Sequence, residues 1–346
     1  MTEFAGFDMP LRYTSIRDEH LAVRGKAGLF DLSHMGEVRI TGPAAGAAVQ
    51  RLVSNDVARL VEGAALYTVM CNDQAGIIDD LIVYRVEDGF LIVVNAARRE
   101  VDIDWMRAHL LPGSELSDES DATALLAVQG PAALAIVTPL AKPGLDSLET
   151  FHSFRGSVAG VPCRISRTGY TGEDGLELYC EAGAAPGLWD ALVEAGRPSG
   201  MLLVGLAARD TLRLEAGLRL YGQDMDDSVD PFSCGLAWTV KLGKGEFIGA
   251  SRLRELDPSH PPRRFAGLLL GEHDLPRHGM AVASDGREVG RITSGGFSFS
   301  LGQGIGTAYL ETQLDPEAAL TVDIRGRAAP ARRVRLPFLR RPTPAG

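Results

Sequence analysis

The stretch that most constrains the fold is an apolar hairpin signal near residue 80. Two runs rich in β-branched residues, 76–85 and 90–95, flank the turn residues Glu87-Asp88-Gly89. Runs of this kind separated by an Asp-Gly signal predict a β-hairpin. Because apolar residues occupy both faces of the runs, we expect the hairpin to be mostly buried. The fold must therefore also accommodate the two carboxylates that the first run carries, Asp79 and Asp80.

Strand pairing predicts that Asp80 and Asn95 lie on the same face of this hairpin. A two-residue loop at Glu87-Asp88 puts Asp80 opposite Asn95, whereas a loop at Asp88-Gly89 puts Asn95 opposite Ile82. In both registers the side-chain period of two points Asp80 and Asn95 the same way. Burying an ionised carboxylate without partners is costly, and two explanations stay open. The pair is either a mutually satisfied structural contact or a site for a polar heterocycle.

Length and composition indicate a globular protein of two or three domains. The chain has 346 residues, 45% of them hydrophobic and 23% charged, which exceeds one ordinary core. No apolar run approaches the roughly 18 residues of a membrane span, and the start of the chain lacks the basic and apolar segments of a signal peptide. We therefore expect a cytoplasmic protein with no membrane contact. The net charge of −10 argues against a nucleic-acid partner.

The cysteines and the basic C-terminal end are the remaining compositional features. The four cysteines are scattered, with no C-x-x-C pair and no histidine at ligand spacing, so they predict small core residues and neither a disulfide framework nor a metal site. Residues 321–346 hold seven arginines against Asp323, a net charge of +6 (7 − 1). This segment is either a solvated barrel surface and tail or a docking patch for an acidic partner. The arginines are Arg325, Arg327, Arg332, Arg333, Arg335, Arg340 and Arg341.

The order of elements predicts an α+β fold followed by a small barrel. Before residue 256, strands and helices follow each other without the regular strand–helix–strand repeat of a βαβ array. We place helices at 16–28, 44–55, 96–110, 186–195 and 205–217, strands at 37–41, 64–70, 123–128, 158–163, 165–168 and 176–180, and a further strand around Trp238. On the first helix we place Glu19 and His20 on the solvent side with their neighbours Arg17 and Asp18. Residues 256–262 contain three prolines and predict a linker, and 265–338 predicts short barrel strands.

Some polar residues have more than one interpretation. Arg209 and Arg213 lie four apart, on one face of a predicted helix, and need either an internal acid such as Asp210 or Glu215 or a bound ligand. His34 lies in an apolar neighbourhood, which predicts a packed, hydrogen-bonded histidine. The glycine patterns at 243–245 and 302–306 fit neither a P-loop nor a dinucleotide fingerprint.

Taken together, seven ordered motifs resemble the T-protein family of the glycine cleavage system, the aminomethyltransferases. The likeness runs from Phe4-Ala5-Gly6 to the C-terminal barrel, essentially the whole chain. The motifs are Gly28-Leu29-Phe30-Asp31-Leu32-Ser33-His34-Met35, Gly76-Ile77-Ile78-Asp79-Asp80-Leu81, Val93-Val94-Asn95-Ala96-Ala97, Arg167-Thr168-Gly169-Tyr170-Thr171-Gly172-Glu173-Asp174-Gly175, Ala208-Arg209-Asp210-Thr211-Leu212-Arg213-Leu214-Glu215-Ala216, Tyr221-Gly222-Gln223-Asp224-Met225 and Ile292-Thr293-Ser294-Gly295.

The resemblance implies a three-domain cloverleaf around a central channel. Residues 1–255 would form a folate-binding region of two interleaved α+β subdomains, and residues 264–346 the C-terminal barrel. The implied co-substrate is tetrahydrofolate, without a metal, and the implied transient partner is lipoylated H-protein. The implied reaction moves the one-carbon unit of the aminomethyl-dihydrolipoyl arm to tetrahydrofolate, giving 5,10-methylenetetrahydrofolate and ammonia.

The resemblance also assigns roles to individual residues. Asp80 matches the family's catalytic aspartate. The positions matching or expected around the folate are Tyr67, Asn95, Glu177 and Arg209, with Tyr170 and Tyr221 lining the same channel. One alternative is a tetrahydrofolate-dependent demethylase acting on a small sulfonium or methylamine compound. A folate-binding accessory protein for iron–sulfur assembly is disfavoured, because residues 231–235 lack the Lys-Gly-Cys-Tyr type of motif.

Overall fold

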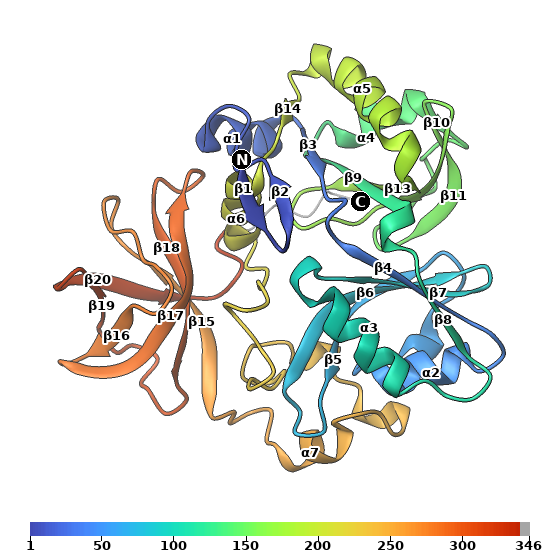
Figure 1. The fold of residues 1–346 in the computed structure, drawn as a ribbon. Coiled ribbons are helices and arrows are strands. Elements are labelled where there is room, and N and C mark those ends of the chain that lie inside the picture. The colour runs from blue at the N-terminus through green and yellow to red at the C-terminus, as the bar shows by residue number, and fades with distance from the viewer. Residues whose placement is uncertain (340–346) are drawn as a thin grey trace.

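The computed structural model describes residues 1–339 and has three lobes, each built on its own sheet (Figure 1). Two lobes are open sheets covered by helices, and the third, formed by the C-terminal strands, is a closed barrel. The predicted α+β class and the C-terminal barrel are therefore confirmed. Arg340 and Arg341 of the basic end lie outside the described residues.

The first lobe is a seven-stranded sheet in the order β10-β11-β12-β13-β9-β3-β14, in which β14 runs parallel to β3 and the other pairs are antiparallel. Helices α4 (Ala133–Val137) and α5 (Ala185–Gly196) pack on one face through an apolar core that includes Leu126, Ile165 and Leu188. The strands are β3 (Gly28–Asp31), β9 (Thr123–Gln129), β10 (Ala141–Lys142), β11 (Ser153–Val158), β12 (Val161–Ser166), β13 (Gly175–Glu181) and β14 (Leu202–Leu203).

The second lobe is a five-stranded antiparallel sheet in the order β5-β6-β7-β4-β8. Helices α2 (Ala45–Leu52) and α3 (Arg99–Ala108) cover its outer face, where Val49, Ile92 and Met106 belong to one buried cluster. The strands are β4 (Gly36–Thr41), β5 (Ala65–Cys71), β6 (Ile77–Val86), β7 (Gly89–Val94) and β8 (Glu115–Asp118).

Strands β6 and β7 form the predicted buried hairpin. Val86 pairs with Gly89, so the loop is Glu87-Asp88, and every residue of β7 is buried. Continuing the register from the Ile82 and Val93 pair puts Asp80 opposite Asn95, as the shorter-loop interpretation predicts. Because successive side chains alternate between faces, Asp80 lies on the inner face of the sheet and its neighbour on the face covered by α3.

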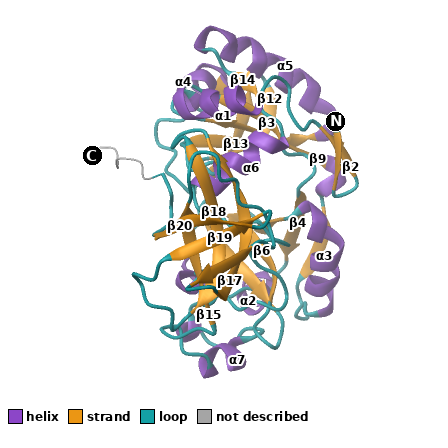
Figure 2. Ribbon diagram, turned by 90° about the vertical axis from the view of Figure 1, so that its left-hand side faces the viewer, coloured by secondary structure: helices purple, strands orange, loops and turns teal. Residues whose placement is uncertain are grey.

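The inner faces of the two sheets pack against each other. Phe30 and Leu125 of the first sheet share a buried cluster with Leu91 and Val93 of the second. At one end of this layer the hydroxyl groups of Tyr84 and Tyr179 lie 3.2 Å apart. Helices α1 (Ile16–Gly25) and α6 (Leu206–Glu215) pack beside the first sheet, as the turned view also shows (Figure 2).

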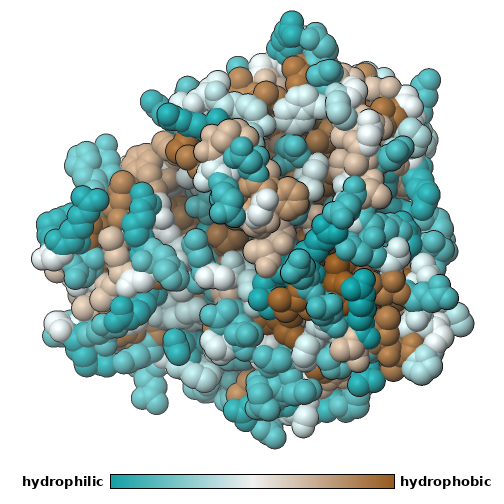
Figure 3. Space-filling model, in the orientation of Figure 1, coloured by the Kyte–Doolittle hydropathy of each residue, from teal (hydrophilic) through white to brown (hydrophobic). Residues whose placement is uncertain are grey.

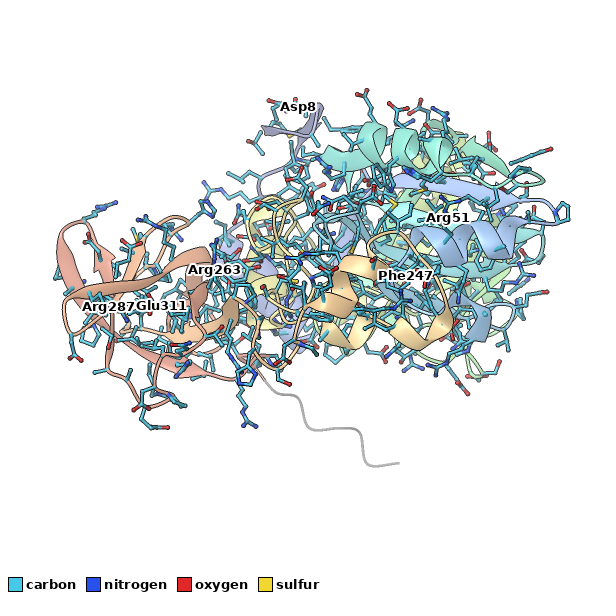
Figure 4. All side chains as sticks on the ribbon, turned by 90° about the horizontal axis from the view of Figure 1, so that it is seen from below. Asp8, Arg51, Phe247, Arg263, Arg287 and Glu311 are labelled. Atoms are coloured by element: carbon cyan, nitrogen blue, oxygen red, sulfur yellow. The ribbon has the colours of Figure 1, made fainter. Side chains whose placement is uncertain are left out.

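The third lobe is a six-stranded barrel in the order β15-β18-β17-β16-β19-β20, closed because β20 pairs with β15. Helix α7 (Ala250–Glu255) precedes the proline-rich linker, and the barrel begins at Arg263. On its outside, Arg287 donates two hydrogen bonds of 2.6 and 2.8 Å to Glu311 (Figure 4). The strands are β15 (Arg263–Leu269), β16 (Ala281–Ser284), β17 (Arg287–Ser298), β18 (Gln303–Glu311), β19 (Leu320–Ile324) and β20 (Arg327–Val334).

The remaining elements are short. Strands β1 (Thr2–Phe4) and β2 (Phe7–Met9) form a two-stranded ribbon at the N-terminus. Single 3₁₀ turns occur at Val57–Arg59, Ala96–Arg98, Ser120–Ala122, Thr138–Leu140, Ala182–Ala184, Arg197–Ser199, Ala237–Thr239 and Leu242–Lys244.

Three sequence predictions are wrong in this part of the structure. The strands predicted at 158–163 and 165–168 have other bounds, because a turn at residues 159–160 separates β11 from β12 and β12 runs unbroken from Val161 to Ser166. Glu19 and His20 are fully buried and do not face solvent. Glu19 accepts a hydrogen bond from the backbone of Gly205 at 2.9 Å, and His20 Nε2 lies 3.1 Å from Glu215. Distant segments of the chain thus supply the hydrogen-bond partners that compensate for the lost hydration of these buried side chains. Trp238 lies in a 3₁₀ turn and not in a strand, and its side chain is largely exposed.

The described residues also bear on the other compositional predictions. The four cysteines are free and buried, as expected for small core residues. No helix within residues 1–339 is long and apolar enough to cross a membrane. Figure 3 shows hydrophilic residues over much of one face, with apolar patches between them. Several of the C-terminal arginines lie on the barrel surface, where Arg327 pairs with Asp274 and Arg333 donates to the backbone of Asp315.

Candidate functional site

A cavity of about 290 Å³ opens where the packing between the two sheets gives way, and α6 and the segment 218–238 close its other sides. The structure brings all seven residues singled out from the sequence to its wall. They are Tyr67, Asp80, Asn95, Tyr170, Glu177, Arg209 and Tyr221. These residues come from strands, a helix and loops that are up to 154 positions apart in the chain (221 − 67).

Asp80 is the carboxylate at the centre of the β6 wall. Its Oδ2 accepts a hydrogen bond from the Tyr67 hydroxyl at 3.0 Å, and its Oδ1 accepts one from Asn95 Nδ2 at 2.9 Å. Burial, and then the charge of Asp79, raise the pKa of Asp80 to about 7. A carboxylate has about four lone-pair positions, so Asp80 keeps room for a ligand while holding both neighbours. The Asp80/Asn95 pair is thus both internally hydrogen-bonded and open to the cavity.

Asn95 ties Asp80 to the carboxylate behind it. The backbone N–H of Asn95 donates to Asp79 Oδ2 at 2.9 Å, and its side-chain Nδ2 donates to Asp79 Oδ1 at 2.8 Å. The same Nδ2 also donates to Asp80 Oδ1, so both of its hydrogens already form hydrogen bonds. No described residue donates to Asn95 Oδ1, and Asn95 lines the cavity. Its carbonyl oxygen can therefore accept a hydrogen bond from a ligand.

Glu177, on β13, contributes a second carboxylate from the opposite sheet. The Thr168 hydroxyl donates to its Oε2 at 2.5 Å, and the Tyr179 hydroxyl approaches the same oxygen at 3.5 Å. Burial raises the pKa of Glu177, although its hydrogen bond from Thr168 and the charge of Arg209 oppose the shift. Within the described chain no group donates to Oε1, which leaves this oxygen to accept from a bound molecule.

Aromatic rings and two arginines form the rest of the wall. The Arg209 guanidinium lies 4.7 Å from the centre of the Tyr170 ring, and Arg98 lies 4.9 Å from that of Tyr221. Burial lowers the pKa of Arg209, and no carboxylate of residues 1–339 forms an ion pair with it. Arg209 is thus a cation held against an aromatic face, with hydrogen-bond donors left for a ligand.

Arg209 and Arg213 have different environments, although they share a helix face. Arg213 is buried and pairs with Asp210 and Asp224, each at 2.7 Å, and donates to Ser294 of the barrel at 2.9 Å. The internal salt-bridge interpretation is therefore correct for Arg213. For Arg209 the ligand-facing interpretation fits the geometry.

His34, Phe4 and Trp238 also line the cavity, although the sequence analysis did not assign them to the site. His34 is only 4% exposed, and its Nδ1 has no hydrogen-bond partner among the described residues, contrary to the expected hydrogen-bonded histidine. Burial and the charge of Arg209 lower the pKa of His34 to about 4. Phe4 packs edge-on against it at 5.6 Å, and Trp238 stacks on Tyr67, also at 5.6 Å. The sequence held no local signal for these contacts, because their partners are distant in the chain.

The arrangement suits a flat, polar heterocycle with hydrogen-bond donors on one edge. Asp80, Asn95 and Glu177 offer acceptors, and the tyrosine and tryptophan rings offer flat apolar surfaces. The pKa of Asp80 lies close to neutrality, which suits proton exchange. No group of three or more His, Cys, Asp or Glu side chains within residues 1–339 is placed to hold a metal ion.

Comparisons with known proteins agree over the whole chain. The family model described as GCVT N-terminal domain matches residues 1–244, and the model described as Glycine cleavage T-protein C-terminal barrel domain matches residues 263–339. An aminomethyltransferase of Desulforamulus reducens is 45% identical over 99% of this chain and 94% of its own, and one of Streptomyces avermitilis is 47% identical with the same coverage. The crystal structure of glycine cleavage system aminomethyltransferase T from Bartonella henselae superposes with a TM-score of 0.90 at 33% identity, covering 98% of this chain and 93% of that one.

Proposed function

Because the chain belongs to the glycine cleavage T-protein family and is an aminomethyltransferase of that system, we propose that its cavity binds tetrahydrofolate as co-substrate. The donor in this proposal is the aminomethyl group on the dihydrolipoyl arm of H-protein, and the products are 5,10-methylenetetrahydrofolate and ammonia. We further propose that residues 1–255 form the folate-binding region and that residues 264–346 form the barrel domain.

The observation that carries the proposal is the convergence of Asp80, Asn95 and Glu177 on one cavity. Each presents an oxygen that can still accept a hydrogen bond, and the cavity between them is bounded by aromatic rings. A reduced pterin has amine and amide donors along one edge of a flat ring, so these residues fit it. We assign Glu177 and Asn95 to that donor edge, because a carboxylate accepts two hydrogen bonds from adjacent N–H groups.

The position of the Arg209 cation suits the anionic tail of the folate. Arg209 has donors to spare above the Tyr170 ring, and the folate tail carries carboxylates. Guanidinium groups bind carboxylates in a bidentate manner. We therefore assign Arg209 to the anionic side of the ligand and Tyr67, Tyr170 and Tyr221 to the walls that stack on or enclose its rings.

The chemistry requires bond exchange at a single carbon. When bound, tetrahydrofolate supplies two amine nitrogens for the one-carbon unit. The carbon loses its bonds to sulfur and to the amino nitrogen and gains two bonds to those nitrogens. The two protons released from the nitrogens end on the thiol and on ammonia, so the exchange balances without an oxidant or a metal.

Asp80 is the residue we assign to this exchange. Its main role is to position the bound heterocycle and to stabilise the positive charge that develops on the carbon as ammonia leaves, an effect that is strong where water is excluded. Because burial brings its pKa to about 7, Asp80 can also take a proton from the attacking amine and return it to a leaving group. Tyr67 and Asn95 keep the carboxylate oriented during both steps.

A reconstituted transfer assay tests the proposal. The protein is incubated with aminomethylated H-protein, with and without tetrahydrofolate, and ammonia and 5,10-methylenetetrahydrofolate are followed. We expect folate-dependent release of both products above the uncatalysed rate. Equal ammonia release in the two samples would contradict the assignment, and transfer from a free sulfonium or methylamine compound instead would favour a demethylase.

A further inference from the structure

A third carboxyl group, Asp102 of α3, lies behind the proposed folate site. It is fully buried, and no N–H or hydroxyl group within residues 1–339 donates a hydrogen bond to either of its oxygens. An ionised carboxylate in such a place would lack compensation for its lost hydration, which costs several kcal/mol or more. A neutral carboxylic acid in the same place carries a hydrogen that it can donate.

The acceptor for this hydrogen is Asp79, which reaches the α3 face of β6. Burial raises the pKa of both carboxyl groups, and the interaction between them opposes that rise at Asp79 and adds to it at Asp102. Asp79 already receives two N–H groups from Asn95, at 2.9 and 2.8 Å. Since two adjacent buried carboxylates do not ionise together, the proton belongs on the member that receives no donors.

We propose that Asp102 is a positioning residue for the transfer reaction: as a neutral acid it donates a hydrogen bond to ionised Asp79 and thereby fixes the orientation of the Asn95 amide. With Asp79 ionised, the Asn95 Nδ2 group points at Asp79 and Asp80 and the Asn95 carbonyl faces the cavity. With Asp79 protonated, the amide can turn and present its NH₂ group to the ligand. The inference rests on the proposed function and adds a residue to it.

The charges around this pair support the assignment. Burial first, and the charge of Asp79 next, raise the pKa of Asp102, and Arg98 is the cation that opposes the shift. Arg98 is itself engaged with the backbone of Ile78 at 3.1 Å and with the Tyr221 ring. The other titratable groups that interact with Asp79 or Asp80 are Tyr67, Tyr170, Tyr221 and Cys234, and Arg219 lines the same cavity as Asp80.

Two substitutions of Asp102 separate a positioning role from a packing role. Asp102→Asn keeps a neutral donor toward Asp79, so we expect the rate and the pH dependence of kcat/KM to stay within about threefold of the unchanged enzyme. Asp102→Leu keeps the volume but removes the donor. The leucine variant loses the hydrogen bond from Asp102 to the ionised Asp79, and hydrogen bonds to charged groups are among the stronger ones. We therefore expect kcat/KM for tetrahydrofolate to fall at least about tenfold. Asp79 then takes up a proton, and the acidic limb assigned to Asp80 moves to lower pH by about one unit.

The control is Asp104→Leu, which makes the same change on the exposed side of α3, where Asp104 is 80% exposed. We expect it to keep the rate and the pH profile. A folded Asp102→Leu enzyme with an unshifted profile would overturn the inference, as would an Asp102→Asn enzyme that loses as much rate as the leucine variant.

Infrared spectroscopy gives a readout that needs no catalysis. Asp80 and buried Glu37, whose pKa burial raises to about 9, also contribute protonated carboxyl groups near neutral pH, so the readout is a difference spectrum. Near pH 8 the unchanged protein minus Asp102→Asn should show one carbonyl band of a buried carboxylic acid. No such band in the difference spectrum would refute a proton on Asp102. The transfer assay tests the proposed function, and its failure with the unchanged enzyme would refute that function. The infrared difference tests only whether Asp102 is protonated, and it keeps its meaning whatever the transfer assay shows.

Discussion

Asp80→Asn is the substitution whose consequences follow most directly from the structure. The amide has the size of the carboxylate, and it can accept from Asn95 with its oxygen while its NH₂ group donates to the Tyr67 hydroxyl, the two groups that now hold Asp80. We therefore expect the variant to fold. The substitution removes a negative charge that lowers the stability of the folded protein, because the charge is buried and lies next to Asp79.

The size of this cost follows from the pKa of Asp80, about 7 in the folded protein against an ordinary value of 3.8. Each pKa unit corresponds to about 1.4 kcal/mol, so charging Asp80 near pH 8 lowers the free energy of unfolding by about 4 kcal/mol. The pKa of about 7 already includes the hydrogen bonds from Tyr67 and Asn95, so removing the charge recovers this amount in full. The sign is set by proton uptake: the folded state holds the proton up to higher pH, so stability falls as pH rises from about 4 to 7.

Thermal unfolding followed by circular dichroism between about pH 4 and pH 8 measures this effect. Relative to the unchanged protein, Asp80→Asn should be about 4 kcal/mol more stable near pH 8, or about 6 °C in Tm, and should lose that gain near pH 4. In the transfer assay it should lose about 10²- to 10³-fold in kcat while the Kd for tetrahydrofolate changes by less than about threefold. The matched control is Asp190→Asn on the exposed side of α5, which should change neither quantity. A Tm difference that is constant with pH, or one that grows toward acid, would refute the reasoning.

Three further substitutions test separate parts of the account. Glu177→Gln puts an amide NH₂ where a donor edge needs an acceptor, so the Kd for tetrahydrofolate measured by calorimetry should rise about 10- to 100-fold; an unchanged Kd would remove Glu177 from the site. Arg213→Met leaves the buried carboxylate of Asp224 without its cation, so urea unfolding should show a loss of about 3–5 kcal/mol, and a loss under about 1 kcal/mol would contradict that. His34→Gln removes a histidine whose pKa is lowered to about 4 from 6.5; because the unfolded state then takes up the proton first, the unchanged protein loses about 3 kcal/mol between about pH 7 and pH 4. The glutamine variant should lack this loss, and an identical acid profile in thermal unfolding would argue against it.

The hairpin and its polar pair were accessible from the sequence because they depend on local rules. A two-residue loop and a side-chain period of two fix the position of Asn95 relative to Asp80, and the paired strands have that register. The barrel was similarly accessible, since the prolines of 256–262 separate two regions with different patterns.

The contacts that shape the site depend on long-range packing and could not be inferred in this way. The sequence analysis placed Glu19 and His20 on the solvent side of the first helix, because their buried partners Gly205 and Glu215 lie more than 180 residues away in the chain. The same limitation applies to Arg209 and Arg213. Spacing placed both on one face, and only the tertiary structure separates the cavity from the salt-bridge network.

Asp102 is the clearest example of a residue whose role could not be predicted from the sequence alone. An aspartate in the first turns of a helix is ordinarily a solvated residue that interacts with the helix dipole. Its burial behind Asp79 follows from packing α3 on the sheet, a contact between elements that no local pattern specifies.

The most direct test of the central claim is a crystal structure of the protein with tetrahydrofolate bound. We predict that the pterin lies in the cavity between the two sheets, with its donor edge within hydrogen-bond distance of Glu177 or Asn95 and its reactive nitrogens beside the Asp80 carboxylate. A pterin bound elsewhere, or one with Asp80 turned away from it, would contradict the account.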